Sequence, residues 1–198
     1  MGAYDRLAAT YNRQWGRYAR TTAREVLGAL PPLEAGPLLD VGCGTGTLLA
    51  LARSRFPGAR LIGAEPSAGM RGVAARTLAD QGVTLLDCPA EALALPDASV
   101  GALTCLNVLH YLADPAAALR EWRRVLRPGG TLVLQDYVPN ALPGFARLAA
   151  LNDRELVRVY TVPEMGELLK SAGFREITAR PFRIDPFWRG GLASGVRP

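Results

Sequence analysis

The chain has 198 residues, of which 49% are apolar and 21% are charged, and its formal net charge is +5. This length fits one ordinary globular domain with a substantial core, and no apolar run is long enough to span a bilayer. The first residues, Met1 to Arg6, are polar at once and lack the apolar stretch of a secretory signal. We therefore expect a cytoplasmic protein without a membrane partner.

The cysteine spacing and the distribution of arginine argue against a disulfide-rich protein, a metal-binding protein and a nucleic-acid-binding protein. The three cysteines, Cys43, Cys88 and Cys105, are an odd number without C-x-x-C spacing, so neither a disulfide framework nor a metal site is expected. The positive charge rests almost wholly on arginine, since Lys170 is the only lysine. The arginines are dispersed without a run of like charge, which argues against a nucleic-acid partner.

The N-terminal segment predicts an amphipathic helix. Tyr11, Trp15 and Tyr18 recur at helical spacing, and a similar apolar pattern over residues 23–30 ends at two prolines. Two interpretations stay open. Either the aromatic stripe packs against the core, or residues 1–36 form a helical lid whose aromatic side chains close over a bound ligand.

The next stretch predicts a strand, a tight turn and a helix. An apolar run ends in an acid, glycines follow at alternate positions, and apolar residues resume with helical spacing. Glycine is needed where the backbone turns with positive φ or approaches a ligand closely. A dinucleotide-binding loop would place its third glycine where Thr47 stands. The observed pattern instead resembles motif I of the class I S-adenosylmethionine-dependent methyltransferases; its residues are Asp40, Gly42, Gly44 and Gly46.

An acidic residue follows the second predicted strand, residues 60–64. A right-handed strand–helix–strand unit places Glu65 at the same sheet edge as the glycine loop. A carboxylate there can accept both hydroxyls of a ribose. The alternative is a charge at the start of a helix, because Pro66 and Ser67 open the next predicted helix, residues 67–81. The spacing from the loop favours ribose binding.

The loop after the third predicted strand resembles the family's adenine-binding segment. Residues 87–97 read D-C-P-A-E-A-L-A-L-P-D, and the family commonly has D-A-E-x-L-P-x-P-D. Pro89 stands where the family has its adenine-contacting aspartate. The resemblance therefore leaves this contact to the Ala90 amide, with Asp87 or Glu91 as candidate substitutes.

A fourth apolar strand, residues 100–106, leads into the most specific match after the glycine loop. Residues 107–130 resemble the passage between the fourth and fifth strands of small-molecule methyltransferases, with a helix that begins at Asp114 and Pro115. Gly101 replaces the aspartate that the family usually has at the start of the fourth strand.

The alternation of strand and helix is interrupted after a fifth strand, residues 131–134. Prolines and apolar residues over 135–160 predict one or two amphipathic helices, and we expect residues 137–160 to be an insertion that covers the substrate. A capping box at Thr161 and Glu164 then begins the last helix.

Two final strands are predicted over residues 175–184 and 191–196, which in the family form a hairpin with the last strand antiparallel inside the sheet. The expected fold class is α/β: a Rossmann-like, seven-stranded, mostly parallel sheet with helices on both faces. We expect one such domain over residues 1–198, with the N-terminal lid and the insertion attached to it.

The resemblance implies that the cofactor is S-adenosyl-L-methionine and that the product is S-adenosyl-L-homocysteine. The methyl group would pass to an O, N or C atom of a small, apolar or aromatic acceptor. Because the sulfonium already makes the methyl carbon electrophilic, positioning and desolvation are the main tasks of the protein. The resemblance implies cofactor contacts from Tyr11, Asp40, Gly42, Cys43, Gly44, Gly46, Glu65, Pro66, Met70, Ala90, Glu91, Leu106 and Asn107.

No catalytic residue is fixed by the sequence. His110, the only histidine of the chain, lies where the fourth strand gives way to a helix. It could deprotonate a phenol or enol, or it could simply fix the loop by hydrogen bonding. Tyr11 is a second candidate.

Two alternative functions stay open. An RNA or protein methyltransferase would suit the positive charge, but the dispersed arginines and the absence of an N-P-P-Y motif after the fourth strand oppose it. A non-catalytic S-adenosylmethionine-binding module is kept open by Pro89 and Gly101. The chain is expected to be a monomer or a homodimer.

Overall fold

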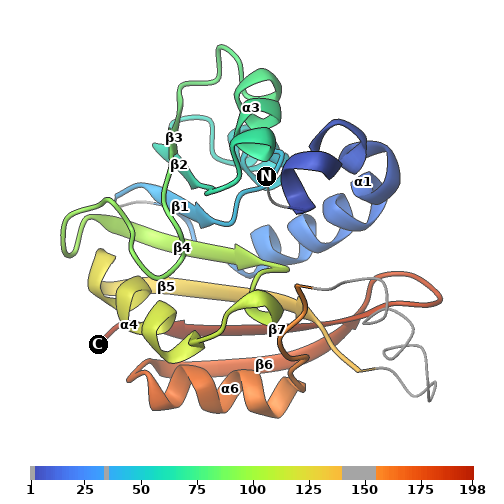
Figure 1. The fold of residues 1–198 in the computed structure, drawn as a ribbon. Coiled ribbons are helices and arrows are strands. Elements are labelled where there is room, and N and C mark those ends of the chain that lie inside the picture. Colours follow the sequence, from blue (N-terminus) through green and yellow to red (C-terminus); the bar gives the residue numbers. More distant parts are fainter. Residues whose placement is uncertain (1–2, 34–35, 140–154) are drawn as a thin grey trace.

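The computed structural model describes residues 3–33, 36–139 and 155–198 (Figure 1). Each of the seven strands expected from the sequence is present. In chain order, the elements are α1 (Ala3–Ala29), β1 (Leu38–Val41), α2 (Thr47–Arg55), β2 (Leu61–Ala64), α3 (Ala68–Thr77), β3 (Val83–Leu86), β4 (Val100–Leu106), the short 3-10 helix η1 (Leu109–Tyr111), α4 (Pro115–Val125), β5 (Leu126–Tyr137), α6 (Val162–Ser171), β6 (Arg175–Arg183) and β7 (Arg189–Val196).

The strands form one sheet in the order β3-β2-β1-β4-β5-β7-β6. Strands β1 to β5 pair in parallel, whereas β7 pairs antiparallel with both β5 and β6. The expected mostly parallel sheet with a terminal hairpin is therefore confirmed. The chain runs outward from β1 to β3 and then returns to β4 on the other side of β1. In such sheets, ligands bind beyond the carboxyl ends of the strands where the order reverses.

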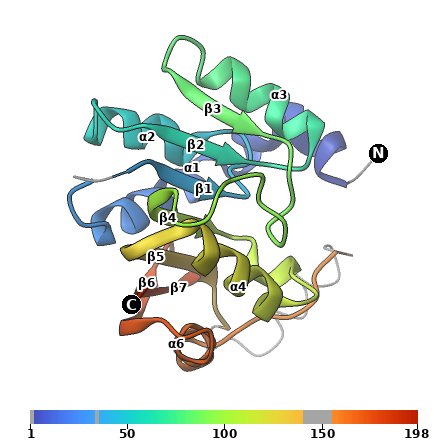
Figure 2. The same cartoon turned by 90° about the vertical axis from the view of Figure 1, so that its left-hand side faces the viewer.

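Helices cover both faces of the sheet (Figure 2). Leu38 belongs to a buried cluster with residues of α1 and α2, whereas its neighbour Leu39 belongs to a second cluster with residues of α4 and α6. Successive side chains of a strand point to opposite faces, so both must be apolar when both faces are covered. This explains why the central strands β1, β2 and β4 are largely apolar along their whole length.

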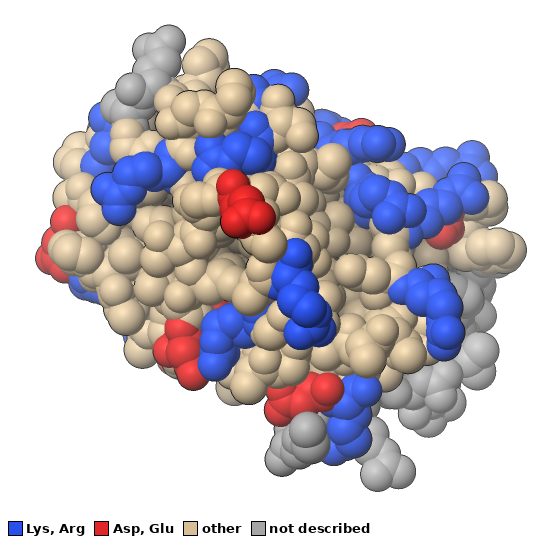
Figure 3. Space-filling view, turned by 90° about the horizontal axis from the view of Figure 1, so that it is seen from above, with Lys and Arg blue, Asp and Glu red and all other residues tan. Residues whose placement is uncertain are grey.

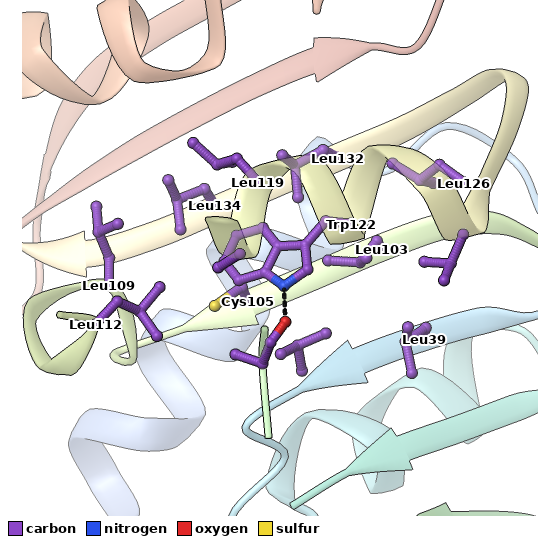
Figure 4. Packing of buried hydrophobic residues seen from close by; sticks show 14 of the residues in the cluster. Leu39, Leu103, Cys105, Leu109, Leu112, Leu119, Trp122, Leu126, Leu132 and Leu134 are labelled. Carbon is purple, nitrogen blue, oxygen red and sulfur yellow. Dashed lines mark hydrogen bonds between the residues drawn. The ribbon is translucent and has the colours of Figure 1, made fainter. Parts of the chain in front are cut away.

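Trp122 of α4 lies at the centre of the second cluster, surrounded by leucines from β1, β4, β5 and α4 (Figure 4). Its side chain is fully buried, and its indole N–H donates a hydrogen bond of 2.9 Å to the Ala90 carbonyl. The neighbouring Glu121 accepts the Leu93 amide at 2.7 Å. Helix α4 thus fixes the loop between β3 and β4, the segment that resembles an adenine-binding loop.

Both predicted helix starts are confirmed by their capping hydrogen bonds. The Asp114 carboxylate accepts the Ala117 amide at 2.9 Å at the start of α4. Thr161 and Glu164 form the expected capping box at the start of α6. In the described part of the chain, no helix is both long enough and apolar enough to cross a bilayer.

Several boundaries differ from the expectation, most of all the end of α3 and the start of β5. Helix α3 ends at Thr77 rather than at residue 81, because the backbone at Asp80 takes a φ of 61°, which is incompatible with a right-handed helix. Strand β5 begins at Leu126 rather than at residue 131. The expected turn continues the ladder because the Gly129 amide donates to the Arg197 carbonyl at 2.8 Å.

The insertion after β5 is only partly described. Residues 140–154, where most of the predicted helix falls, lie outside the described residues. Residues 155–160 are not helical, so this part of the prediction was wrong. The Val157 and Arg158 amides donate to the His110 carbonyl at 2.9 and 3.2 Å, and these bonds tie the segment to η1 instead of allowing intrahelical pairing.

Replacing the central tryptophan tests whether α4 holds the adjoining loop. Trp122→Phe should lower the free energy of unfolding by about 1–3 kcal/mol, because the buried Ala90 carbonyl loses its donor. Urea unfolding measures the change. Arg120→Ala, on the exposed face of the same helix, should change it by less than about 0.5 kcal/mol. Equal effects of the two substitutions would contradict this assignment.

Candidate cofactor and acceptor site

The glycine loop joins β1 to α2 at the point where the strand order reverses. All three glycines have positive φ, 68° at Gly42, 54° at Gly44 and 81° at Gly46. A Cβ on Gly42 would lie 2.3 Å from Val108 Cγ2, and one on Gly46 would lie 2.8 Å from Leu78 Cδ1. At Gly44 the nearest atom would be a backbone oxygen 4.0 Å away. Close packing thus explains two of the glycines, whereas the Cα of the middle one faces open space.

Glu65 faces this loop from the end of β2. One carboxylate oxygen accepts the Gly44 amide at 2.9 Å, and the other accepts the Ser67 amide at 2.9 Å. Burial raises the pKa of Glu65, although these two amides and the charge of Arg71 act in the opposite direction. The two interpretations of this acid therefore describe one position, because Glu65 lies both beside the glycine loop and at the start of α3.

Asp40 is a second buried acid at this edge. It is 3% exposed, and one of its oxygens accepts the Thr104 hydroxyl at 2.7 Å. Burial raises the pKa of Asp40 to about 7, and the nearby charge of Glu65 adds to the shift. Two acids whose charge Arg71 offsets only in part make this edge a favourable place for a positive ligand.

Helix α1 crosses the same edge and lies close to the start of α3, the glycine loop and Glu65. Its Asp5 carboxylate accepts the Gly69 amide at 2.9 Å, at the first turn of α3. Its Asn12 side chain accepts the Thr45 hydroxyl at 2.7 Å, in the glycine loop. Burial and the charge of Glu65 raise the pKa of Tyr11, which places this phenol beside the acid. The N-terminal helix therefore lies against the glycine loop and the start of α3.

The candidate adenine loop is engaged in ion pairing. Asp87 pairs with Arg71 at 2.6 Å, and the same guanidinium donates to the Glu65 carbonyl at 2.7 Å. The Ala90 carbonyl bonds to α4, and Glu91 is exposed. Of the two candidate substitutes for the missing aspartate, Asp87 is thus already held by a cation.

The other residues named for the cofactor differ in exposure, and their contacts with it stay predictions. Burial raises the pKa of the Cys43 thiol, so it remains protonated and suits a role as an apolar filler. Among this group, Cys43 and Met70 are buried, Leu106 and Asn107 are half-buried, and Pro66 is exposed.

A buried histidine–aspartate pair lies at the ends of β4 and β5. His110 Nδ1 is 2.7 Å from Asp136 Oδ1, and the two side chains are only 5% and 2% exposed. His110 was a candidate from the sequence, whereas Asp136 was missed because the fifth strand was predicted to end at residue 134. A carboxylate two residues after the apolar run of a parallel strand was the signal available.

Aromatic rings from α1, β5 and the β6–β7 hairpin gather beside this edge. The Tyr18 hydroxyl of α1 donates to Asn107 Oδ1 at 2.9 Å, and the Tyr18 ring lies edge-on to Trp188 with centroids 5.9 Å apart. Trp188 in turn contacts Tyr137 at 5.6 Å. Trp15 and Trp188 also line a cavity of about 230 Å³ between α1 and the β6–β7 hairpin. Trp188 was not predicted, since only the closing of the hairpin brings it to this edge.

The surface charge does not form a continuous basic face in the view of Figure 3. Arginines are scattered there between uncharged and acidic side chains. In the described part of the chain, no group of three or more histidine, cysteine or acidic side chains could hold a metal ion.

The comparisons with known proteins define the family. A model of a methyltransferase domain matches residues 39–134. A demethylmenaquinone methyltransferase of Thermus thermophilus is 38% identical over 162 residues, which cover 78% of this chain and 70% of that relative. The chain therefore belongs to the class I S-adenosylmethionine-dependent methyltransferases.

Two further similarities bear on length and fold. An uncharacterized protein of Mycobacterium tuberculosis is 34% identical over 184 residues, which cover 90% of this chain but 59% of that relative. The chain thus spans less than two thirds of the length of this relative. A structure of the Haloferax volcanii Trm112 methyltransferase activator in complex with a methyltransferase matches with a TM-score of 0.83 and 21% identity, over 100% of this chain and 99% of that chain. At this identity the likeness concerns the fold.

Alanine substitutions at two glycines of the loop distinguish a glycine required by close packing from one that faces open space. Gly44→Ala should lower the free energy of unfolding by about 1–2 kcal/mol, through left-handed backbone strain alone. Gly42→Ala should lower it by about 1–3 kcal/mol more, because the new Cβ also meets Val108. Urea unfolding measures both, with Gly58→Ala as a control in open space. Equal losses at Gly42 and Gly44 would refute the distinction.

Proposed function

We propose that this protein transfers a methyl group from S-adenosylmethionine to a small aromatic or apolar acceptor. The observation that carries the proposal is the buried Glu65 carboxylate, whose oxygens face the Gly44 amide and the first turn of α3. An acid in this place can accept the two ribose hydroxyls, while the loop backbone approaches the methionine part.

The residues present fit this donor. The open Cα face of Gly44 leaves a cradle that a side chain would fill. Asp40 and Glu65 supply negative charge without a metal, which suits the amino group and the sulfonium of the donor. S-adenosylmethionine supplies an electrophilic methyl carbon when it is bound. The chain binds the ribose through Glu65, orients the amino group through Asp40, and excludes water by means of the proposed lid, residues 1–36.

The acceptor class is inferred from the aromatic walls. Trp188 contacts both Tyr18 and Tyr137 edge to face, and these rings offer flat apolar surfaces. The name of the Thermus thermophilus relative, a demethylmenaquinone methyltransferase, supports a planar acceptor of this kind. We propose that the insertion at residues 137–160 covers this acceptor. No observation specifically favours an RNA or protein substrate.

Calorimetry with S-adenosylmethionine and S-adenosylhomocysteine tests the proposal directly. Both should bind to the full chain with one site each. If neither ligand binds, both the methyltransferase activity and a non-catalytic binding function are excluded.

The Glu65 carboxylate should control cofactor affinity. Glu65→Gln should weaken S-adenosylmethionine binding by about 10–100-fold, because a charged acceptor of hydrogen bonds is lost. The matched control is Glu167→Gln, an exposed position on α6 whose side chain is 71% exposed, and it should leave affinity unchanged. Isothermal titration calorimetry provides both values. An unchanged affinity in Glu65→Gln would contradict the ribose assignment.

Cofactor binding should release protons near neutral pH. The pKa of Asp40 is raised to about 7, so its carboxyl group is partly protonated there. A cationic ligand stabilises the carboxylate and lowers this pKa, so affinity should increase as the pH rises from about 6 to about 8. Calorimetry in buffers of different ionisation enthalpy counts the released protons. In Asp40→Asn this release should disappear; its persistence would assign it to another group.

A further inference from the structure

The Asp136 carboxylate accepts hydrogen bonds from three donors at or next to His110. It accepts the His110 amide at 3.0 Å and the Tyr137 amide at 2.7 Å. His110 Nδ1 lies 2.7 and 2.9 Å from its two oxygens. An ionised carboxylate can only accept hydrogen bonds, so Nδ1 must carry a proton. In the neutral imidazole, the lone pair is then on Nε2.

The Nε2 atom has no hydrogen-bond partner among the described residues. The imidazole is instead flanked by rings, with Tyr111 at 3.8 Å and Tyr137 at 4.7 Å between centroids. The side chain keeps 5% of its surface accessible. With Nδ1 held by Asp136, Nε2 is the ring nitrogen that can accept a proton from a bound ligand.

The pair lies at the edge that carries the candidate cofactor site. Strand β4 is the direct neighbour of β1, and the Asn107 amide at its end bonds to the Gln135 carbonyl of β5 at 2.9 Å. The Tyr18 hydroxyl, bonded to Asn107, has a pKa raised by burial and by the charge of Asp136, so α1 closes the same space. The imidazole thus lies close to Asn107, one of the residues expected to contact the donor.

We propose that His110 is the general base of the reaction and that the acceptor is a phenol or enol whose hydroxyl is protonated at neutral pH. Asp136 is the positioning residue that holds the proton on Nδ1. This inference rests on the proposed function, whose donor it shares.

The step balances without a further reactant. The hydroxyl proton passes to His110 Nε2 as its O–H bond breaks. The oxygen electron pair forms the new bond to the methyl carbon, and the pair of the breaking S–C bond stays on sulfur. The products are a methyl ether, a neutral thioether and an imidazolium paired with Asp136, which returns its proton to solvent. The buried carboxylate stabilises this imidazolium.

The position of the imidazole proton can be measured without any acceptor, because His110 is the only histidine of the chain. In untagged, ¹⁵N-labelled protein, the ring nitrogen shifts of the neutral form should place the imidazole proton on Nδ1. Asp136→Asn should move a large part of the population to the Nε2–H tautomer. A proton on Nε2 in the unchanged protein would overturn the proposal, whether or not S-adenosylmethionine binds.

Phenols of different acidity distinguish a histidine that acts as a general base from a histidine that has only a structural role. With S-adenosylmethionine and a panel of phenols and naphthols, His110→Gln should lose about 100-fold in kcat on 4-methylphenol, which is protonated at neutral pH. At about pH 8.5, where 4-nitrophenol is largely ionised and 4-methylphenol is not, it should lose less than about 3-fold on 4-nitrophenol. Equal losses on both would overturn the assignment of a base.

Two controls complete the design. Asp114→Asn makes the same change as Asp136→Asn at the start of α4, where asparagine also caps a helix, and it should leave both kcat and the tautomer unchanged. If S-adenosylmethionine binds but no phenol or naphthol in the panel is methylated, the acceptor class proposed here is wrong. Failure to bind the cofactor would instead refute the proposed function.

Discussion

The hydrogen bonds of the Glu65 carboxylate hold the cofactor edge together. They connect the glycine loop after β1 with the start of α3 after β2. This bridge depends on the parallel register of the two strands, in which Val41 lies opposite Ala64. The Ala64 carbonyl then accepts the Gly42 amide at 2.8 Å, so the loop is already fixed before the side chain adds its own contacts. The position of the acid is therefore a consequence of strand pairing.

The electrostatics of this edge oppose those of the whole chain. The net charge is +5, yet burial raises the pKa of both Asp40 and Glu65, and the charge of Asp5 on α1 adds to the shift at Glu65. Acids placed close together in a buried site destabilise one another's ionised forms. Arg71 offsets this only in part, because it also pairs with Asp87. A cationic ligand at this proposed site would remove the remaining imbalance, so the proposal links selectivity for a sulfonium donor to the burial of the acids.

Local patterns predicted what depends on neighbouring residues, and they failed where distant segments meet. The glycine loop, the acid after β2 and the start of α4 at Asp114 follow from short motifs, and the structure has each element in place. The His110–Asp136 pair joins residues 26 positions apart, and it exists only because β4 and β5 are neighbours. Trp188 reaches the site through the closing of a hairpin. The end of α3 depends on Asp80, whose left-handed backbone conformation could not be predicted from the sequence.

The two interpretations of α1 apply to its two halves. In the C-terminal half, Ala23, Val26 and Leu27 are buried in the cluster under β1, so this half is part of the core. In the N-terminal half, Trp15 is 39% exposed, and Asp5 and other polar groups make the contacts to the sheet edge. Each such hydrogen bond contributes only about 0.5–1.5 kcal/mol net, whereas a fully buried large apolar side chain contributes about 1.5–3 kcal/mol. Movement of the proposed lid would therefore cost least in the N-terminal half, where polar contacts rather than buried apolar surface hold the helix against the cofactor edge.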